Sequence, residues 1–300
     1  MTRRKPVNYL NNKDILKEIH KSKSSYSYYI DKKYDLFDAI VDNLSDINDE
    51  VITLAKEKRL KRIIDNDKEE QLKNGTIKKN IVPLNMTVDD IPEEDLVFRV
   101  MTYEHIPLQE GRVKTPKKDA DYRVRLSFKP FKHYIIKDGD FCEVGRSHWK
   151  DGLHNGVFCQ DHGKITDKLG MMYMELANRF ARKGNYRSYS YKEDMVDRAI
   201  EQLVFAGLSF DESKTDNPFA YFTVCCTTSF TSILNIEKKN QNLRDNLIEA
   251  YGGSPSFTRQ VENEFNQQME SYYEDRGLEQ PKPLNVPKVG FKKKPAVKND

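Results

Sequence analysis

The clearest hydrophobic pattern lies between residues 168 and 250, where apolar side chains recur every three or four positions, as on the buried face of a helix. A first stripe ends near Gly184 and a second at Gly207, and glycine commonly terminates helices. A third begins at Asn217-Pro218, a capping residue followed by proline at the first helical position, and extends to about Tyr251. The three predicted buried faces are Leu169, Met172, Leu176 and Phe180, then Met195, Ala199, Leu203 and Ala206, then Phe219, Phe222, Cys226, Phe230 and Ile233.

Further helices are predicted on either side of this region. Asn11 is a good N-cap for a short helix that carries Ile15, Leu16 and Ile19. A second stretch, roughly 35 to 73, places Ile47, Val51 and Leu54 on one face and then becomes almost wholly charged, which is typical of a solvated helix. A shorter helix is predicted from Thr258 to Tyr273.

The segment from about 81 to 165 has a different pattern of apolar and polar residues. Residues 97–100 and the alternating residues 122–128 predict strands, and glycine, aspartate and asparagine cluster from 138 to 163. We therefore expect a small α+β insert with long loops in a mainly α-helical protein.

The predicted organisation has six parts. They are an N-terminal helix (1–30), a charged helical segment (31–80), the α+β insert (81–165), a helical core (166–254), a short helical segment (255–278) and a disordered basic tail (279–300). The tail holds four prolines and many lysines, a composition that does not form a packed core.

Composition limits the classes of function. Hydrophobic residues make up 37% of the 300 residues and charged residues 32%, while the net charge is only +3. Any affinity for nucleic acid must therefore come from local patches. No run approaches the 18 or so apolar residues of a membrane span, and the N-terminus lacks the apolar run of a signal peptide. Cys225 and Cys226 are adjacent, which favours reduced thiols and a cytoplasmic location.

One group of metal-ligating residue types stands out, and it comprises Cys142, His148, His154, Cys159 and His162. Cysteine and histidine are zinc's preferred ligands. The group has no Cys-x-x-Cys pair, so an ordinary loop is the favoured interpretation and a zinc site the alternative. Since no phosphate-binding loop, nucleophile elbow or His-Glu-x-x-His motif occurs, we expect neither an enzyme nor a cofactor.

The third helix of the 168–250 region has a polar face that suits DNA. Hydroxyl and amide side chains run along it and lead into Lys238 and Lys239. Small polar groups can approach base edges while lysines hold phosphates. The alternative is an ordinary amphipathic helix whose polar face is rich in serine and threonine.

Several motifs in this region resemble region two of bacterial sigma factors, in the same order and with similar gaps. They are Leu176-Ala177-Asn178-Arg179-Phe180, Tyr191-Lys192-Glu193-Asp194-Met195-Val196, Phe210-Asp211-Glu212-Ser213-Lys214 and Asn217-Pro218-Phe219-Ala220-Tyr221-Phe222-Thr223. The chain is most similar to the late-transcription sigma factors of T-even-type bacteriophages, whose N-terminal helix also resembles residues 8–16. The resemblance covers roughly 8–22 and 168–250.

The resemblance implies a subunit that binds the host RNA polymerase core in the host cell cytoplasm and directs it to the −10 element of late promoters. In the family, an acidic-aliphatic helix docks on the polymerase clamp, which implies polymerase contacts at Asp194, Asp197 and Arg198. The next helix faces the promoter. The DNA-binding positions implied here are Tyr221, Phe222, Thr228, Ser229, Ser232, Lys238 and Lys239.

The chain departs from the family in several ways. Primary sigma factors place two tryptophans where this chain has Cys225-Cys226, so Tyr186, Tyr189 and Tyr191 are candidate substitutes for opening DNA. No −35-reading domain is predicted. T-even relatives rely on a late coactivator and on the phage sliding clamp, which are therefore candidate partners, but their clamp-binding tail is acidic where this one is basic. The alternative functions are a nucleic-acid-binding accessory protein without initiation activity and, third, a metal-dependent enzyme.

Overall fold

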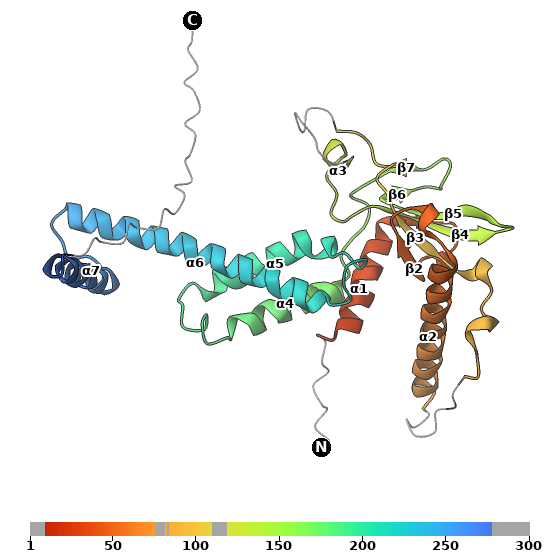
Figure 1. The fold of residues 1–300 in the computed structure, drawn as a ribbon, viewed down its shortest axis with the longest axis horizontal. Helices are drawn as coiled ribbons and strands as arrows, with labels where there is room; N and C mark the ends of the chain where they lie inside the picture. Colours follow the sequence, from red (N-terminus) through yellow and green to blue (C-terminus); the bar gives the residue numbers. More distant parts are fainter. Residues whose placement is uncertain (1–9, 76–81, 83, 110–118, 278–300) are drawn as a thin grey trace, which may run out of the picture. The chain divides into compact units, whose positions relative to one another are not determined.

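The computed structural model describes residues 10–75, 82, 84–109 and 119–277. The chain divides into two compact units, Met1–Ile233 and Leu234–Asp300, and the boundary falls within the long helix α6. The described residues form seven α-helices and a small mixed sheet (Figure 1). The prediction of a mainly α protein is confirmed at that level, since 56% of the described residues are helical.

A five-stranded sheet forms one part of the first unit. Its strands are β1 (Ser27–Tyr29), β2 (Ala39–Val41), β3 (Phe98–Met101), β4 (Phe131–Lys137) and β5 (Asp140–Ser147). They are ordered β1-β5-β4-β3-β2, with β2 parallel to β3 and the other pairs antiparallel. A separate ribbon pairs β6 (Trp149–Lys150) with β7 (Val157–Phe158), and the one-turn helix α3 covers Asp119–Tyr122.

The β4–β5 hairpin is specified by local sequence. Lys137 pairs with Asp140, so Asp138-Gly139 forms a two-residue turn. Both turn residues have positive φ, 53° and 87°, as a type I′ turn requires, and Asp-Gly is a favoured pair for that turn.

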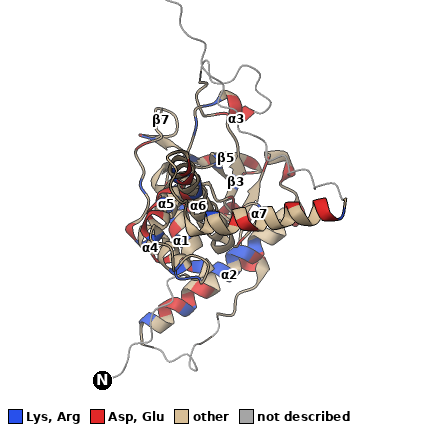
Figure 2. Cartoon of the chain, turned by 90° about the vertical axis from the view of Figure 1, so that its left-hand side faces the viewer, with Lys and Arg blue, Asp and Glu red and all other residues tan. Residues whose placement is uncertain are grey.

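Helix α2 (Asp49–Lys73) packs on this sheet and begins at Asn48, whose side chain accepts a hydrogen bond from the Val51 amide. Its fully buried Ala55 contacts a cluster formed with Ile91, Leu96 and Phe98. Lysine, arginine, aspartate and glutamate are interspersed along it (Figure 2).

The buried Asp38 ties α2 to the sheet. It accepts hydrogen bonds from Arg59 at 3.2 Å and Arg62 at 2.6 Å, both on α2, and from the Val97 amide at 2.9 Å. One carboxylate thus joins α2 to the segment that enters β3.

The helical part of the first unit comprises α1 (Asn12–Ser25), α4 (Asp167–Ala181), α5 (Lys192–Ala206) and the start of α6 (Pro218–Ala250). Tyr173 of α4 packs edge-to-face against Phe222 of α6 with ring centroids 5.1 Å apart, and Phe180 packs in the same way against Phe230 at 5.0 Å. The N-caps of α1 and α4, Asn11 and Thr166, each accept a backbone hydrogen bond.

The second unit contains the remainder of α6 and helix α7 (Phe257–Asp275). The turn between them is held by Asp245, which accepts hydrogen bonds from the Ser256 amide at 2.9 Å and hydroxyl at 2.7 Å. No residue of α7 is buried.

Most predicted helices occur at the expected places, including those near 12–25, 168–181, 192–206, 218–250 and 257–275. Four predictions are wrong. The helix expected from residue 35 begins only at Asp49, because residues 27–41 contribute β1 and β2 to the sheet, so the 31–80 segment is not wholly helical. Residues 122–128 form no strand but an isolated bridge at Arg123. Leu54 and Phe219, both expected on buried helix faces, are 63% and 39% exposed. The tail from 279, expected to be disordered, lies outside the described residues.

Among the described residues one helix, α6, is long and apolar enough to cross a membrane by length and composition, although no apolar run of membrane-spanning length was expected from the sequence. In the first unit its side chains Phe222, Cys226 and Phe230 are buried.

Candidate functional site

The residues predicted to contact polymerase lie together on the exposed side of α5. Asp194, Asp197 and Arg198 are three and four positions apart, so they share one helical face, and all three are exposed. Arg198 donates a hydrogen bond to Glu201 at 2.6 Å. The opposite face of α5 is anchored by the fully buried Met195 and Ala199, so the exposed face is held in a fixed orientation.

A groove of about 520 Å³ lies between α4 and α5, beside this face. Asp197 lines it together with the apolar side chains Met174, Val196 and Ile200. Met174 is 52% exposed, although it lies between core residues of α4. The charged residues that line the groove also include Arg182, Arg187, Lys192 and Glu193. Apolar and charged groups in one groove suit an amphipathic helix of another protein.

Two residues predicted to face DNA lie instead in the protein core. Phe222 is 1% exposed and Ser229 is 4% exposed, and the Ser229 hydroxyl donates to the Cys225 carbonyl at 2.9 Å. The folded unit therefore offers neither to DNA, because both fall on the face of α6 that packs on α4. Tyr221 is half-buried, and its hydroxyl donates to the Ala206 carbonyl at 2.9 Å.

Thr228 is exposed as predicted, and Ser232 is half-buried. Thr227 and Thr231 are also exposed. The hydroxyls of Thr227 and Thr228 donate to the carbonyls of the residues four positions earlier, at 2.9 and 3.0 Å. Since the donor is used within the helix, each threonine presents an acceptor oxygen and a methyl group. Methyl groups can contact the thymine methyl in a major groove.

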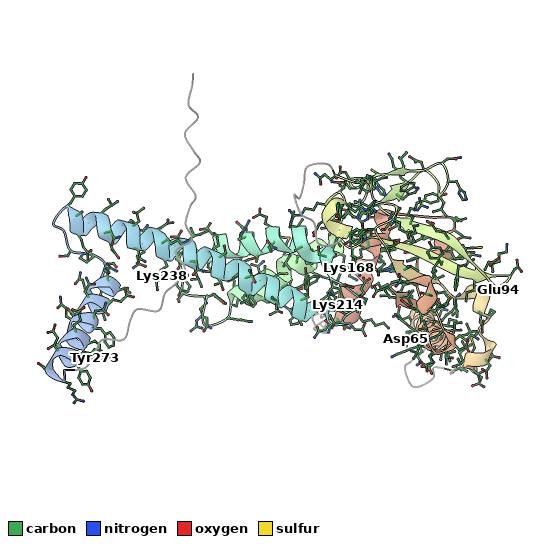
Figure 3. All side chains as sticks on the ribbon, turned by 45° about the horizontal axis from the view of Figure 1, so that its top comes forward. Asp65, Glu94, Lys168, Lys214, Lys238 and Tyr273 are labelled. Carbon is green, nitrogen blue, oxygen red and sulfur yellow. The ribbon has the colours of Figure 1, made fainter. Side chains whose placement is uncertain are left out.

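Lys238 and Lys239 belong to the second unit, where both are exposed on α6 (Lys238 is labelled in Figure 3). Exposed lysines at this position can hold phosphates.

The aromatic candidates for opening DNA have different environments. The ring of Tyr186 packs against the core residues Phe180 and Phe230, with centroids 5.4 and 4.9 Å apart, so one of its faces is covered. Tyr189 is 40% exposed and lies 5.1 Å from the ring of Tyr191. Of the three, Tyr189 exposes the most ring surface for stacking, because Tyr186 and Tyr191 are both half-buried.

Burial raises the pKa of the Cys226 thiol to about 12, so this thiol stays protonated at neutral pH.

Sequence reasoning missed a buried ionic cluster centred on Arg99 of β3. Its guanidinium carbon lies 3.8 Å from the ring centroids of both Phe37 and Phe131. Arg99 donates to Nε2 of His133 at 2.9 Å and to Glu212 at 2.9 Å. The only signal in the sequence was an arginine within an apolar strand.

The same cluster fixes the charge state of His133. Its Nε2 accepts from Arg99, so Nδ1 must carry the proton that is donated to the Tyr34 carbonyl at 2.7 Å. Burial and the positive charge of Arg99 hold the pKa of His133 well below its usual value. The histidine is therefore neutral.

Glu212 connects the cluster to the helices. It lies in the loop before α6 and pairs with Lys23 of α1 at 3.3 Å as well as with Arg99. Burial acts to raise the pKa of Glu212, but the charges of Lys23 and Arg99 outweigh it and the pKa is lowered. The carboxylate is thus ionised and joins three elements: β3, α1 and the loop before α6.

Within the described ranges, no three histidine, cysteine, aspartate or glutamate side chains are arranged to hold a metal ion. Cys142 is exposed on β5, whereas His148 is fully buried, and its ring centroid lies 4.2 Å from that of Phe128.

Comparison of the chain with protein-family models, with curated proteins and with solved structures finds no match.

Proposed function

We propose that the chain is a phage-encoded sigma factor that binds the host RNA polymerase core and directs it to the −10 element of late promoters, in the host cell cytoplasm. The observation that carries the proposal is the exposed face of α5, where Asp194, Asp197 and Arg198 lie side by side next to an amphipathic groove. These are the positions at which the resemblance to sigma region two implies contact with the polymerase clamp.

Promoter contact is assigned to the accessible part of α6. Thr228 and Ser232 are the proposed base-facing residues, with Tyr221 at their edge and Lys238 and Lys239 on phosphates. A coactivator and the sliding clamp are candidate partners on the family resemblance alone. The proposal includes no catalytic step and no cofactor.

One observation favours the second candidate, a nucleic-acid-binding accessory protein without initiation activity. Trapping an unpaired base needs aromatic platforms. Phe222 is buried and two cysteines occupy the positions of the tryptophans of primary sigma factors. Such a protein would bind DNA without polymerase.

The polymerase contact is tested by reversing two charges. The double variant Asp194→Lys, Asp197→Lys should reduce affinity for core polymerase tenfold or more, because about 1.4 kcal/mol corresponds to tenfold and desolvated charge contacts exceed that. The affinity is measured by titrating labelled core polymerase with the full chain.

The matched control is Glu94→Lys, Asp140→Lys, which makes the same change in charge at two exposed residues far along the sequence from α5 (Glu94 is labelled in Figure 3). Equal core binding by both double variants, with unchanged circular dichroism, would remove α5 from the interface.

A further inference from the structure

A second groove, separate from the α4–α5 groove, lies between α1 and α2. It has a volume of about 410 Å³ and is closed at one side by the loop before α6. We call it the α1–α2 groove. Asp65, which marks its α2 side, is labelled in Figure 3.

The floor of the α1–α2 groove is apolar. Leu16 of α1, Leu36, Phe37 and Ile40 line it. Leu36 is 42% exposed and the other three are half-buried. Apolar side chains gathered in a concave site, with a polar rim, are typical of surfaces that bind another molecule.

The rim of the groove carries unpaired positive charge. Lys17 on α1, and Lys58 and Lys61 on α2, line it, and none of the three has a carboxylate within ion-pair distance among the described residues, although the charge of Asp216 acts on Lys58 from farther away. The Lys58 ammonium lies 5.0 Å from the ring centroid of Phe37, so a cation and an apolar floor residue meet at one point.

The carboxylates in the groove are only partly balanced. Asp65 and Glu69 share the single ammonium of Lys13, at 3.1 and 3.5 Å, which leaves one negative charge over, whereas Glu212 pairs with both Arg99 and Lys23. Asp216 has no ion pair among the described residues, but its negative charge acts on Lys58. Three rim lysines thus face about two unbalanced carboxylate charges. The surface offered to a partner is therefore apolar in the middle and positive at the rim.

We propose that the α1–α2 groove binds an acidic amphipathic helix of a partner protein. The apolar side chains of that helix would fill the floor, and its aspartates and glutamates would meet Lys17, Lys58 and Lys61. A nucleic-acid backbone would satisfy the lysines but leave the apolar floor without a partner, because phosphates and sugars bury little apolar surface there. The inference does not depend on the proposed function.

The test uses a fluorescein-labelled designed helix of roughly four turns, with leucine at i, i+3, i+4 and i+7 and glutamate on the other faces. Fluorescence anisotropy is followed as the full chain is added. The wild-type chain should bind, with an affinity that falls as salt is added. The double variant Lys17→Glu, Lys61→Glu should weaken binding at least tenfold. The single variant Leu36→Ser should do the same.

The matched control is Lys137→Glu, Lys164→Glu, an equal charge change at exposed lysines outside the groove. A second probe with alanine replacing leucine should bind poorly to every variant. Equal binding of the designed helix by the groove variants and the control, at unchanged melting temperature, would overturn the proposal. A labelled single-stranded oligonucleotide is titrated in the same way. If the groove variants lost affinity for the oligonucleotide but not for the designed helix, the groove would be a nucleic-acid site and the proposal would be overturned.

Discussion

Arg99 lies at the point where the sheet, α1 and the loop before α6 meet, and it is 1% exposed. Two aromatic rings cover its faces and His133 and Glu212 accept from its edge. A buried cation is costly unless it is paired and hydrogen-bonded, so the cluster is stable only while Glu212 is present and ionised. Arg99 thus connects the folding of the sheet to the position of the start of α6.

Replacing Glu212 should therefore destabilise the first unit strongly. Glu212→Gln leaves Arg99 and Lys23 buried without a counter-ion, and breaking a buried pair in this way costs roughly 3–5 kcal/mol. The free energy of unfolding is measured by urea denaturation. The control Arg198→Gln breaks an exposed pair with Glu201 and should cost about 0–1 kcal/mol. Similar losses for the two variants would show that the cluster is not the link described.

The buried histidines predict a dependence of stability on pH. Burial lowers the pKa of His105 and of His148 to about 3. Below pH 6.5 these histidines bind protons in the unfolded chain but stay neutral in the folded chain. The free energy of unfolding is therefore unaffected above pH 6.5 and decreases as the pH falls below it. At pH 5 the loss is on the order of 2 kcal/mol for each histidine.

Urea denaturation at pH 7 and pH 5 measures this loss. His105→Gln should reduce the difference between the two pH values, whereas His154→Gln, at an exposed position, should leave it unchanged. A free energy of unfolding that is the same at pH 5 and pH 7 would contradict the assignment of neutral buried histidines.

At the scale of elements, helices with strong periodicity and local caps could be predicted from sequence. The starts at Asn11 and at Asn217-Pro218 are set by neighbouring capping residues. The end of α5 is not, because Gly207 has a φ of −63° and a Cβ there would clash with the hydroxyl oxygen of Tyr173 on α4, so packing requires the glycine. The strands β1 and β2, of three residues each, are too short to show a period, and their pairing with distant β5 and β3 decides their conformation. The turn Asp138-Gly139 was a usable signal for the β4–β5 hairpin that was overlooked.

The candidate site was predictable in part. The exposed positions Asp194, Asp197 and Arg198 follow from the helical period of α5, because its apolar stripe fixes the opposite face. The burial of Ser229 did not follow, since a small hydroxyl can bond its own helix and so enter a core. Nor could the sequence show that Arg99 and Glu212, 113 positions apart, would meet.

Helix α6 offers a matched pair of neighbouring hydroxyls. Thr228 is exposed and Ser229 is buried, although both donate to a carbonyl four positions earlier. If α6 faces the promoter, Thr228→Ala should change the preference among −10 variants, where each mismatch is worth about 1–3 kcal/mol. Ser229→Ala should leave that preference unchanged. Run-off transcription from a small −10 library, with melting curves alongside, measures both, and identical profiles would exclude α6 as the DNA-facing element.

At the scale of the whole molecule, the resemblance to sigma factors covers about a third of the chain, in most of α1 and all of α4, α5 and α6. The sheet and α2 lie outside it. They are nevertheless joined to the resembling part by the Arg99, Glu212 and Lys23 contacts. This arrangement indicates that the sheet supports the helices and contributes to the proposed binding groove. It does not fit a sheet that is an independent appendage.

Reconstituted run-off transcription measures whether the chain enables core polymerase to start transcription, as we propose. Host core polymerase is supplied with the full chain and a template that has an AT-rich −10 element and no −35 element. We predict a discrete run-off transcript that depends on the chain and is lost with Asp194→Lys, Asp197→Lys. Transcript levels no higher than those of core polymerase alone, from a core preparation that responds to a known sigma factor, would contradict the claim.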